Sequence, residues 1–297
     1  MLNFFLLALM PAAFSLNAVV GRALTGMFLP AQLTTVRWLG AAALVALIAL
    51  WSSRRECWLP GKQGWSRILI LGAFGTGFCS YAAFAGVQAS SATNVGLIYT
   101  TTAALVVLFE IATRQARAST LLILGVGLAI TGAATIVTKG HLTEITELTL
   151  NVGDLWAVGG TISWAGYTVA MKHQKSDFTP LPLFVVMGVA GAIAASPFAI
   201  LETAKAGPPV INATSMSWLA VGILISSVAS YLSYNVALKR CGPILTSAAL
   251  TLSGVYTAVF AVLLVNEQLG WFHAAGGALV IGGLGLINLQ RYLEQKR

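Results

Sequence analysis

AQLTTVRWLGAAALVALIALWSSRR, residues 31–55, sets the fold of this 297-residue chain. Residues 31–51 are mostly apolar, and a helix needs about 20 such residues to cross the hydrocarbon core of a bilayer. The stretch then runs into the basic pair Arg54 and Arg55. Because Lys and Arg beside a span mark its cytoplasmic end, the stretch predicts a transmembrane helix that ends in the cytoplasm.

Nine further segments of the same kind follow or precede it. The ten predicted spans cover residues 4–21, 31–51, 66–87, 93–111, 119–138, 153–171, 182–201, 217–237, 244–265 and 272–290. Thirteen Lys and Arg residues fall in alternate gaps and the C-terminal tail, three fall in the other gaps, and Arg37 lies inside the second span. The positive-inside rule therefore predicts that both termini are cytoplasmic.

Composition excludes most other classes of protein. The chain is 57% hydrophobic and 9% charged. Soluble domains, in contrast, carry about 25% charged residues. The net charge of +8 comes from residues in the short gaps, so it indicates topology rather than nucleic-acid binding. The three cysteines form no CxxC motif or Cys/His cluster, and no HExxH, GxSxG or aspartate pair occurs. We expect no metal, no cofactor and no enzymatic activity.

The chain divides into two related units, residues 1–146 and 147–297. Four features recur in the same order in both units: a Trp, a Ser-Tyr pair, a Tyr-Thr pair, and a Glu eleven residues after the tyrosine of the Tyr-Thr pair. They are Trp65, Ser80-Tyr81, Tyr99-Thr100 and Glu110, then Trp218, Ser230-Tyr231, Tyr256-Thr257 and Glu267. Glycines seven apart also recur, Gly125 and Gly132, then Gly276 and Gly283, and they predict close helix approach. Since each unit has five spans, the two repeats would have inverted topology.

These motifs carry a family resemblance that covers essentially the whole chain. Glu267, the glycine-rich last span and the Ser-Tyr and Tyr-Thr pairs resemble EamA-type ten-helix members of the drug/metabolite transporter superfamily. Within it the chain looks closest to YddG-type exporters of aromatic amino acids. The resemblance implies an all-α integral membrane fold, with ten transmembrane helices in two inverted five-helix repeats around a central cavity. It also implies export across the bacterial inner (plasma) membrane.

Polar and aromatic side chains gather on one face of six spans, the first, third, fourth, sixth, eighth and ninth. In the eighth span, Ser227, Ser230, Tyr231 and Tyr234 follow helical spacing. We expect these six faces to line the cavity and the other four spans to support it. The candidate substrate-binding residues are Asn17, Tyr81, Tyr99, Thr100, Ser163, Trp164, Tyr231, Tyr234, Asn235 and Tyr256. For any single Ser or Thr, an alternative role is hydrogen bonding between packed helices.

Charge inside the spans is scarce. No Asp, Glu or His lies in the middle of a span, so a facilitator, or coupling through an unidentified group, is expected. Arg37 has two readings: it could extend to the membrane surface, or it could pair with a substrate carboxylate or carbonyl.

The predicted function is alternating-access transport of small organic metabolites, above all aromatic or hydrophobic amino acids, through a neutral cavity with aromatic walls. Cationic drugs, nucleosides and threonine-like amino acids are alternative substrates, and a channel or lipid scramblase is an alternative mechanism. The expected partners are the small-molecule substrate and the lipid bilayer, with no nucleic acid and with the protein as a monomer.

Overall fold

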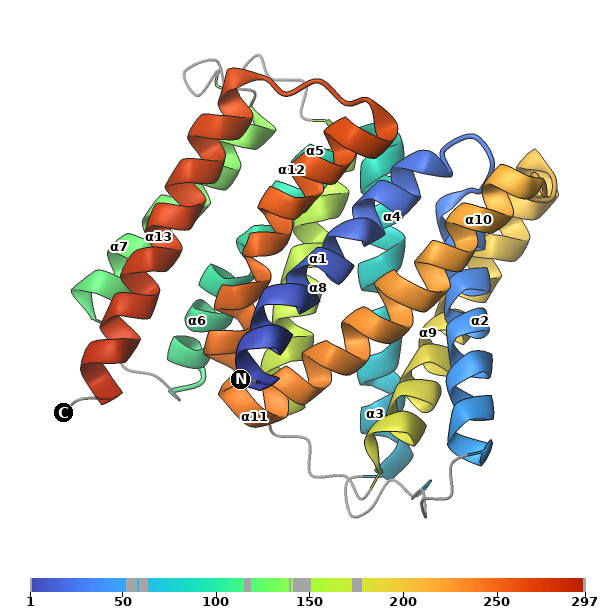
Figure 1. The fold of residues 1–297 in the computed structure, drawn as a ribbon, viewed down its shortest axis with the longest axis horizontal. Coiled ribbons are helices and arrows are strands. Elements are labelled where there is room, and N and C mark those ends of the chain that lie inside the picture. Colours follow the sequence, from blue (N-terminus) through green and yellow to red (C-terminus); the bar gives the residue numbers. More distant parts are fainter. Residues whose placement is uncertain are drawn as a thin grey trace.

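The computed structural model of the chain is a bundle of helices (Figure 1). The structure describes residues 2–51, 58, 64–114, 119–138, 140, 151–172 and 178–295. Every regular element within these ranges is a helix, which agrees with the all-α expectation. The ends marked N and C both lie in the lower part of Figure 1.

The helices follow the predicted spans closely. The first half contains α1 (Leu2–Ala23), α2 (Pro30–Trp51), α3 (Gly64–Gly72), η2 (Ala73–Phe78), α4 (Cys79–Ala89), α5 (Ala92–Thr100), α6 (Thr102–Ala112) and α7 (Thr120–Val137). The second half contains α8 (Val152–Lys172), α9 (Pro180–Ala206), α10 (Ala213–Val221), η3 (Gly222–Ala229), α11 (Ser230–Leu250), α12 (Leu252–Val265) and α13 (Trp271–Gln295). Each predicted span lies in one helix or in consecutive helices. Gly242, whose backbone is non-helical, separates the eighth span from the ninth within α11.

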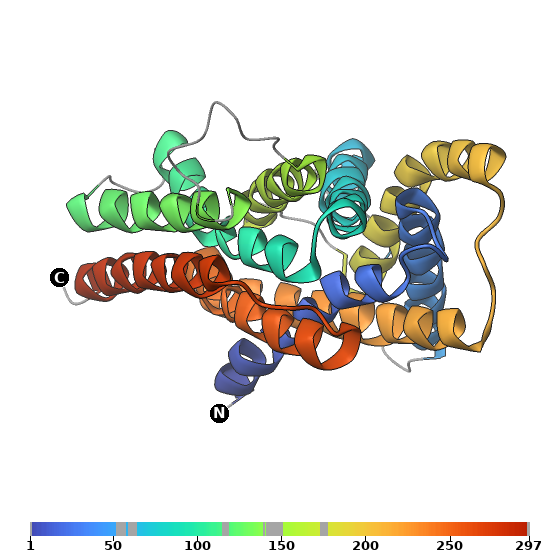
Figure 2. The same ribbon diagram turned by 90° about the horizontal axis from the view of Figure 1, so that it is seen from above.

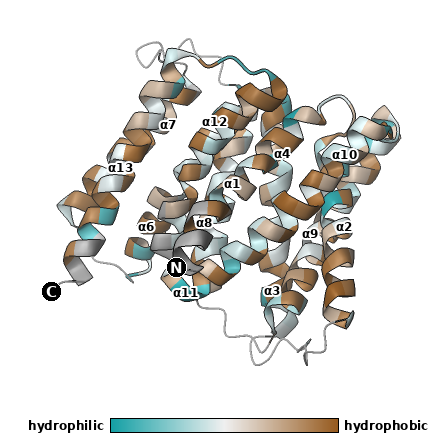
Figure 3. Ribbon diagram, viewed as in Figure 1, coloured by the Kyte–Doolittle hydropathy of each residue, from teal (hydrophilic) through white to brown (hydrophobic). Residues whose placement is uncertain are grey.

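Length and hydropathy fit a membrane protein. Six helical stretches in the described ranges are long and apolar enough to cross a bilayer: 30–51, 64–89, 92–112, 180–206, 213–242 and 271–290. Two shorter apolar helices are Thr120–Ile136 and Leu252–Val265. Large apolar side chains lie on the outside of the bundle, such as Leu47 and Leu263 at 65% and 70% exposure. Figure 3 shows hydrophobic residues along most of α2 and hydrophilic ones in the loop between α12 and α13.

The helices form a central group flanked by two pairs. α7 packs along α13 on one side, and α2 packs along α9 on the other, as Figures 1 and 2 show from two directions. Between these pairs lie α1, α4, α5, α8, α11 and α12. The flanking helices correspond to the second, fifth, seventh and tenth spans, which were expected to support the others from outside.

Two π-helical segments interrupt the third and eighth spans. η2 ends at Phe78, just before Cys79 and Ser80, and η3 ends at Ala229, just before Ser230. A π turn contains an extra residue, so it rotates the side chains that follow relative to an unbroken α-helix. Such segments are frequent at functional sites, and here both of them precede a Ser-Tyr pair.

Glycines bring α7 and α13 into backbone contact. A Cβ atom added at Gly125 would lie 2.5 Å from the carbonyl oxygen of Gly283, and one added at Gly132 would lie 2.5 Å from that of Gly276. The glycines that recur in the two halves therefore face one another across the interface. This confirms the predicted close helix approach.

This contact generates a stability prediction. Gly132→Ala should force α7 and α13 apart and lower the unfolding free energy by about 1–3 kcal/mol, the usual range for overpacking. Gly127→Ala is the matched control on the same helix, because a Cβ placed there meets no atom of another helix within 4 Å. When the variants are unfolded by heat in detergent, the midpoint temperature should be lower than that of the parent protein for Gly132→Ala only. Equal midpoints for the two variants would contradict the backbone contact.

Candidate functional site

A small cavity lies between the two halves of the chain, with a volume of about 50 Å³. It is bordered by α1, α4, α5, α8, α12 and the part of α11 on both sides of Gly242. These helices carry the six predicted cavity-lining spans. The lining residues are Phe14, Ser15, Asn17, Ala18, Cys79, Ala83, Val95, Gly96, Tyr99, Trp164, Tyr231, Leu250, Ser253 and Thr257.

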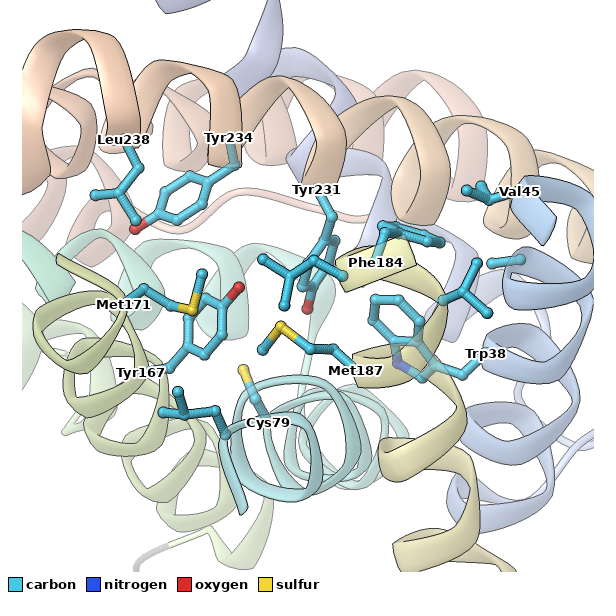
Figure 4. Packing of buried hydrophobic residues seen from close by; sticks show 14 of the residues in the cluster. Trp38, Val45, Cys79, Tyr167, Met171, Phe184, Met187, Tyr231, Tyr234 and Leu238 are labelled. Atoms are coloured by element: carbon cyan, nitrogen blue, oxygen red, sulfur yellow. The ribbon is translucent and has the colours of Figure 1, made fainter. Parts of the chain in front are cut away.

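An aromatic cluster closes one wall of the cavity. The ring of Trp164 lies 5.2 Å from that of Tyr231, 4.9 Å from that of Tyr234 and 4.9 Å from that of Tyr167, between centroids. Phe14 of α1 lies 5.6 Å from Trp164 and 5.2 Å from Tyr231. Figure 4 shows Tyr167, Tyr231 and Tyr234 entering this region from α8 and α11. The rings come from both halves, so relative movement of the halves would separate them.

The cavity is too narrow to hold an organic substrate in this conformation. The space of about 50 Å³ is room for a few water molecules only. Sites for small organic ligands are larger, typically from about 300 Å³ upward. The aromatic cluster must therefore open before a substrate of amino-acid size can enter.

Two polar groups of the cavity, from Tyr99 and Asn17, differ in their hydrogen bonding. The Tyr99 hydroxyl donates to the Cys79 carbonyl oxygen at 2.9 Å, which fixes this ring between α5 and α4. The side-chain Oδ1 of Asn17 is buried and has no hydrogen-bond partner. A buried acceptor without a donor is costly, because it has lost its water and gained nothing. A donor on a bound molecule would remove that cost.

Two predicted residues lie directly behind the lining. Tyr234 is fully buried, and its hydroxyl lies 2.6 Å from that of Thr168. The Asn235 Oδ1 accepts a hydrogen bond from the Tyr167 hydroxyl at 3.2 Å. These bonds tie α11 to α8 and hold the aromatic cluster in place. Of the ten candidates, Asn17, Tyr99, Trp164 and Tyr231 line the cavity, and Tyr234 and Asn235 support it.

The other four candidates lie elsewhere. Tyr81 borders a side pocket of about 300 Å³, where its ring lies 5.3 Å from Trp156 and 6.2 Å from Phe198. Thr100 borders a groove between α5, α12 and α13. Ser163 donates to the Phe74 carbonyl oxygen at 2.9 Å. The Tyr256 ring stacks on that of Phe260, with the centroids 6.2 Å apart. Successive helix positions are rotated by about 100°, so Tyr256 leaves the face on which Thr257 meets the cavity.

Several lining residues were absent from the candidate set. Ser253 and Thr257, one helical turn apart on α12, share the inner face that Tyr256 leaves. Both belong to the polar face expected for the ninth span, and their i and i+4 positions lie on one side of the helix. Cys79 gave no signal in the sequence, because a single apolar-like cysteine resembles ordinary packing.

The structure corrects one reading of Arg37. Its side chain does not extend to the surface, because it is 0% exposed. Its Nη1 donates to the Ser227 hydroxyl at 2.6 Å, and its Nη2 donates to the Ser80 hydroxyl at 2.7 Å. Both hydroxyls lie in the bundle interior, on the neighbouring helices η3 and α4. These two hydroxyls therefore hold the guanidinium inside the bundle rather than at the membrane surface.

Carboxylates join the halves at the end of the bundle opposite the termini, the upper end in Figure 1. Glu267, after α12, accepts from the backbone N–H groups of Ala92 and Thr93 at 2.7 and 3.1 Å. Glu202 of α9 accepts from those of Ala31 and Gln32 at 2.9 and 3.0 Å. The unpaired N–H groups of a helix N-terminus favour a negative charge. We call these two sets the cross-half carboxylate contacts.

Further polar contacts surround the N-terminus of α5. Arg22 Nε lies 3.6 Å from Glu267 Oε1, and Ser90 donates to the Asp154 carboxylate at 2.6 Å. His273 Nδ1 accepts from the Gly270 N–H. The other ring nitrogen of a neutral His is then the donor, and His273 Nε2 lies 2.8 Å from Asn94 Oδ1. This end of the bundle is therefore closed by bonds between residues of the two halves.

Comparison with known proteins identifies the family. A sequence model of the EamA-like transporter family matches residues 1–138 and again residues 151–289. A protein of Archaeoglobus fulgidus described as an uncharacterized transporter is 26% identical over 263 residues, which cover 89% of each chain. The uncharacterized transporter YyaM of Bacillus subtilis is 26% identical over 280 residues, 90% of this chain and 88% of YyaM.

The fold also occurs among solved structures. One crystal structure superposes with a TM-score of 0.67 at 20% identity and covers 96% of both chains. The two matches of the family model include most of the sequence, and the similar proteins are described as transporters. The chain therefore belongs to the EamA-like transporter family.

Proposed function

We propose that the protein exports small organic metabolites, most of all aromatic and hydrophobic amino acids, by alternating access across the bacterial inner membrane. The observation that carries this proposal is the small uncharged cavity with aromatic walls between the two halves. Its rings suit an apolar or aromatic substrate, since ring pairs contribute about 0.5–1.5 kcal/mol beyond burial. The free Asn17 Oδ1 offers an acceptor for a substrate ammonium group.

Several features support an inverted repeat of residues 1–146 and 147–297. The family model matches the chain twice. α4 of the third span packs on α8 of the sixth span, and in the same way η3 and α11 of the eighth span pack on α1 of the first span. The π segments η2 and η3 lie in the third and eighth spans, which correspond to each other. The pairs α2–α9, α5–α12 and α7–α13 each join corresponding spans of the two halves. Such repeats place the substrate site near the bilayer midplane, with both termini on one side, here the cytoplasmic one.

The cross-half carboxylate contacts supply the closed side in this mechanism. The predicted topology places Glu202 and Glu267 at the outer surface, and both carboxylates come from the second half while their helix N-termini belong to the first. Opening toward the outside must break these bonds. The narrow cavity and the closed outer end then describe one state of a carrier.

Transport by cavity variants tests the proposal. Trp164→Ala should slow exchange of labelled phenylalanine in proteoliposomes by about tenfold or more, because it removes ring contacts at the centre of the site. Tyr99→Ala should act in the same direction. Tyr256→Ala is the control, since this ring lies outside the cavity, and it should transport normally.

The same assay discriminates between substrates and mechanisms. We would add four unlabelled compounds as competitors of labelled phenylalanine: tryptophan, threonine, a nucleoside and a quaternary ammonium dye. A carrier shows faster uptake when unlabelled substrate is inside the vesicle, and a channel does not. Normal transport by both Trp164→Ala and Tyr99→Ala would show that the cavity is not the substrate site.

A second prediction concerns the outer end. Glu267→Gln removes the negative charge that the α5 N-terminus attracts, so it should favour the outward-open form. Cys79 lines the cavity and serves as a reporter once Cys57 and Cys241 are replaced by Ser. A membrane-impermeant thiol reagent added outside should then label Cys79 several-fold faster than in the parent protein, since each kcal/mol shifts an equilibrium by a factor of about 5.

Glu294→Gln is the control for this experiment, because it makes the same substitution near the end of α13, whereas Glu267 precedes the start of that helix. It should leave the labelling rate unchanged. Glu202→Gln should act like Glu267→Gln. Unchanged labelling of Cys79 in both variants would contradict a role for these contacts in closing the outer side.

A further inference from the structure

Arg37 places a positive charge deep in the bundle. It lies inside the second predicted span, two turns from the start of α2, and it is fully buried. The ring centroids of Trp38 and Phe84 each lie 5.0 Å from its guanidinium carbon. Ionisable groups at membrane depth are costly to bury and generally serve a function, so this one requires an explanation.

Its partners in the described part of the chain are neutral. Ser227 and Ser80 each accept one hydrogen bond from the guanidinium, and no carboxylate within these residues accepts one. Its Nε is buried and has no hydrogen-bond partner. A guanidinium has five N–H donors and matches a carboxylate through two parallel bonds, which are stronger than bonds to hydroxyls. Arg37 is thus short of an anion.

Arg37 lies one side chain away from the cavity. Ser80, which accepts from Arg37, also accepts from Trp38 Nε1 at 2.9 Å and follows Cys79 of the cavity wall. The Trp38 ring meets that of Tyr231, another wall residue, edge to face at 4.7 Å. Figure 4 shows Trp38, Tyr231 and Cys79 around the same cluster. Movement of Ser80, Cys79 and Tyr231 would expose the guanidinium to the cavity.

The position of Arg37 is on the outer side of the cavity. A Cβ added at Gly222 would lie 3.2 Å from Val20 and 3.4 Å from Arg37 Cδ. Val20 follows the cavity residues Asn17 and Ala18 on α1, toward the end of the bundle closed by the cross-half carboxylate contacts. Arg37 therefore lies between the level of the cavity and the outer end of the bundle.

The two serines belong to different halves, Ser80 to the first and Ser227 to the second. If the halves separate on the outer side, Ser227 moves away from Arg37 and frees Nη1. Nη1 and Nη2 form the end edge of the guanidinium, which can bind a carboxylate through two parallel bonds while the other N–H of Nη2 still bonds Ser80.

We propose that Arg37 is a substrate-binding residue that selects a carboxylate, and that Ser227 holds its guanidinium while the outer side is closed. The inference rests on the proposed function and narrows its substrate class. Amino acids and other carboxylates are favoured. Cationic drugs are disfavoured, because a cation near an unpaired guanidinium is repelled strongly where little water screens the charges.

A matched pair of ligands tests this selection. Phenylalanine and phenylalaninamide share the ring and the ammonium group, but only phenylalanine has a carboxylate. In proteoliposomes, Arg37→Gln should raise KM for phenylalanine by about tenfold or more, the usual effect of losing a hydrogen bond to a charged group. KM for phenylalaninamide should stay the same or fall. Arg37→Lys, which keeps the charge, should restore part of the preference.

Arg67→Gln is the control, because Arg67 lies on the exposed surface of α3, and it should leave both KM values unchanged. A loss of folding in Arg37→Gln would lower the transport of both ligands equally, and a change in their ratio excludes that explanation. If the parent protein transports phenylalanine and Arg37→Gln keeps the preference for it over phenylalaninamide, the inference is overturned.

A second measurement separates this inference from the proposed function. If the parent protein transports neither ligand, the proposed amino-acid export fails. Thermal unfolding in detergent then tests Arg37 with phenylpyruvate, phenylpropionate and pyruvate as probes. At least one of these carboxylates should raise the unfolding midpoint of the parent protein and not that of Arg37→Gln. Absence of stabilisation by all three would overturn the inference.

Discussion

The absence of water from the bilayer core governs this structure. A backbone N–H or C=O group without a partner in hydrocarbon costs several kcal/mol, so the spans are helices whose bonds are made internally. The same constraint sorts the side chains. Leu47 and Leu263 face outward, whereas Asn17, Ser253 and Thr257 turn toward the cavity. Lipid thus excludes polar side chains from the outer surface, so they lie in the interior. The cavity forms where the polar faces meet.

The hydrophobic effect does not hold such helices together, because lipid chains are as apolar as leucine. Close packing replaces it. Gly125 and Gly132 let α7 approach Gly283 and Gly276 of α13 until backbone meets backbone. The flanking pairs can then act as stiff supports, while the six inner helices carry the polar groups. At the closed end, carboxylates of the second half add bonds to helix N-termini of the first half.

Much of this arrangement could be predicted from the sequence, because lipid imposes simple rules. Span length and the distribution of Lys and Arg located the helices, and polar faces identified the six that border the cavity. The direction of single side chains was harder to predict. Tyr81 and Tyr231 each follow a π segment, which rotates the side chains after it, yet Tyr81 borders a side pocket and Tyr231 borders the cavity. Such π segments depend on packing, which local sequence does not encode.

The direction of the Arg37 side chain could not be predicted from the sequence. In the proposed mechanism, the same residue links substrate binding to the opening of the outer side. A position in a span does not reveal whether a guanidinium reaches the surface, because that depends on acceptors supplied by other helices, here Ser80 and Ser227. A ligand shifts a conformational equilibrium only by its difference in affinity for the two forms. In the proposed mechanism, a substrate carboxylate competes with Ser227 and gains its second bond only when the halves part. The carboxylate therefore binds the outward-open form more tightly, and the substrate itself favours the opening through which it leaves.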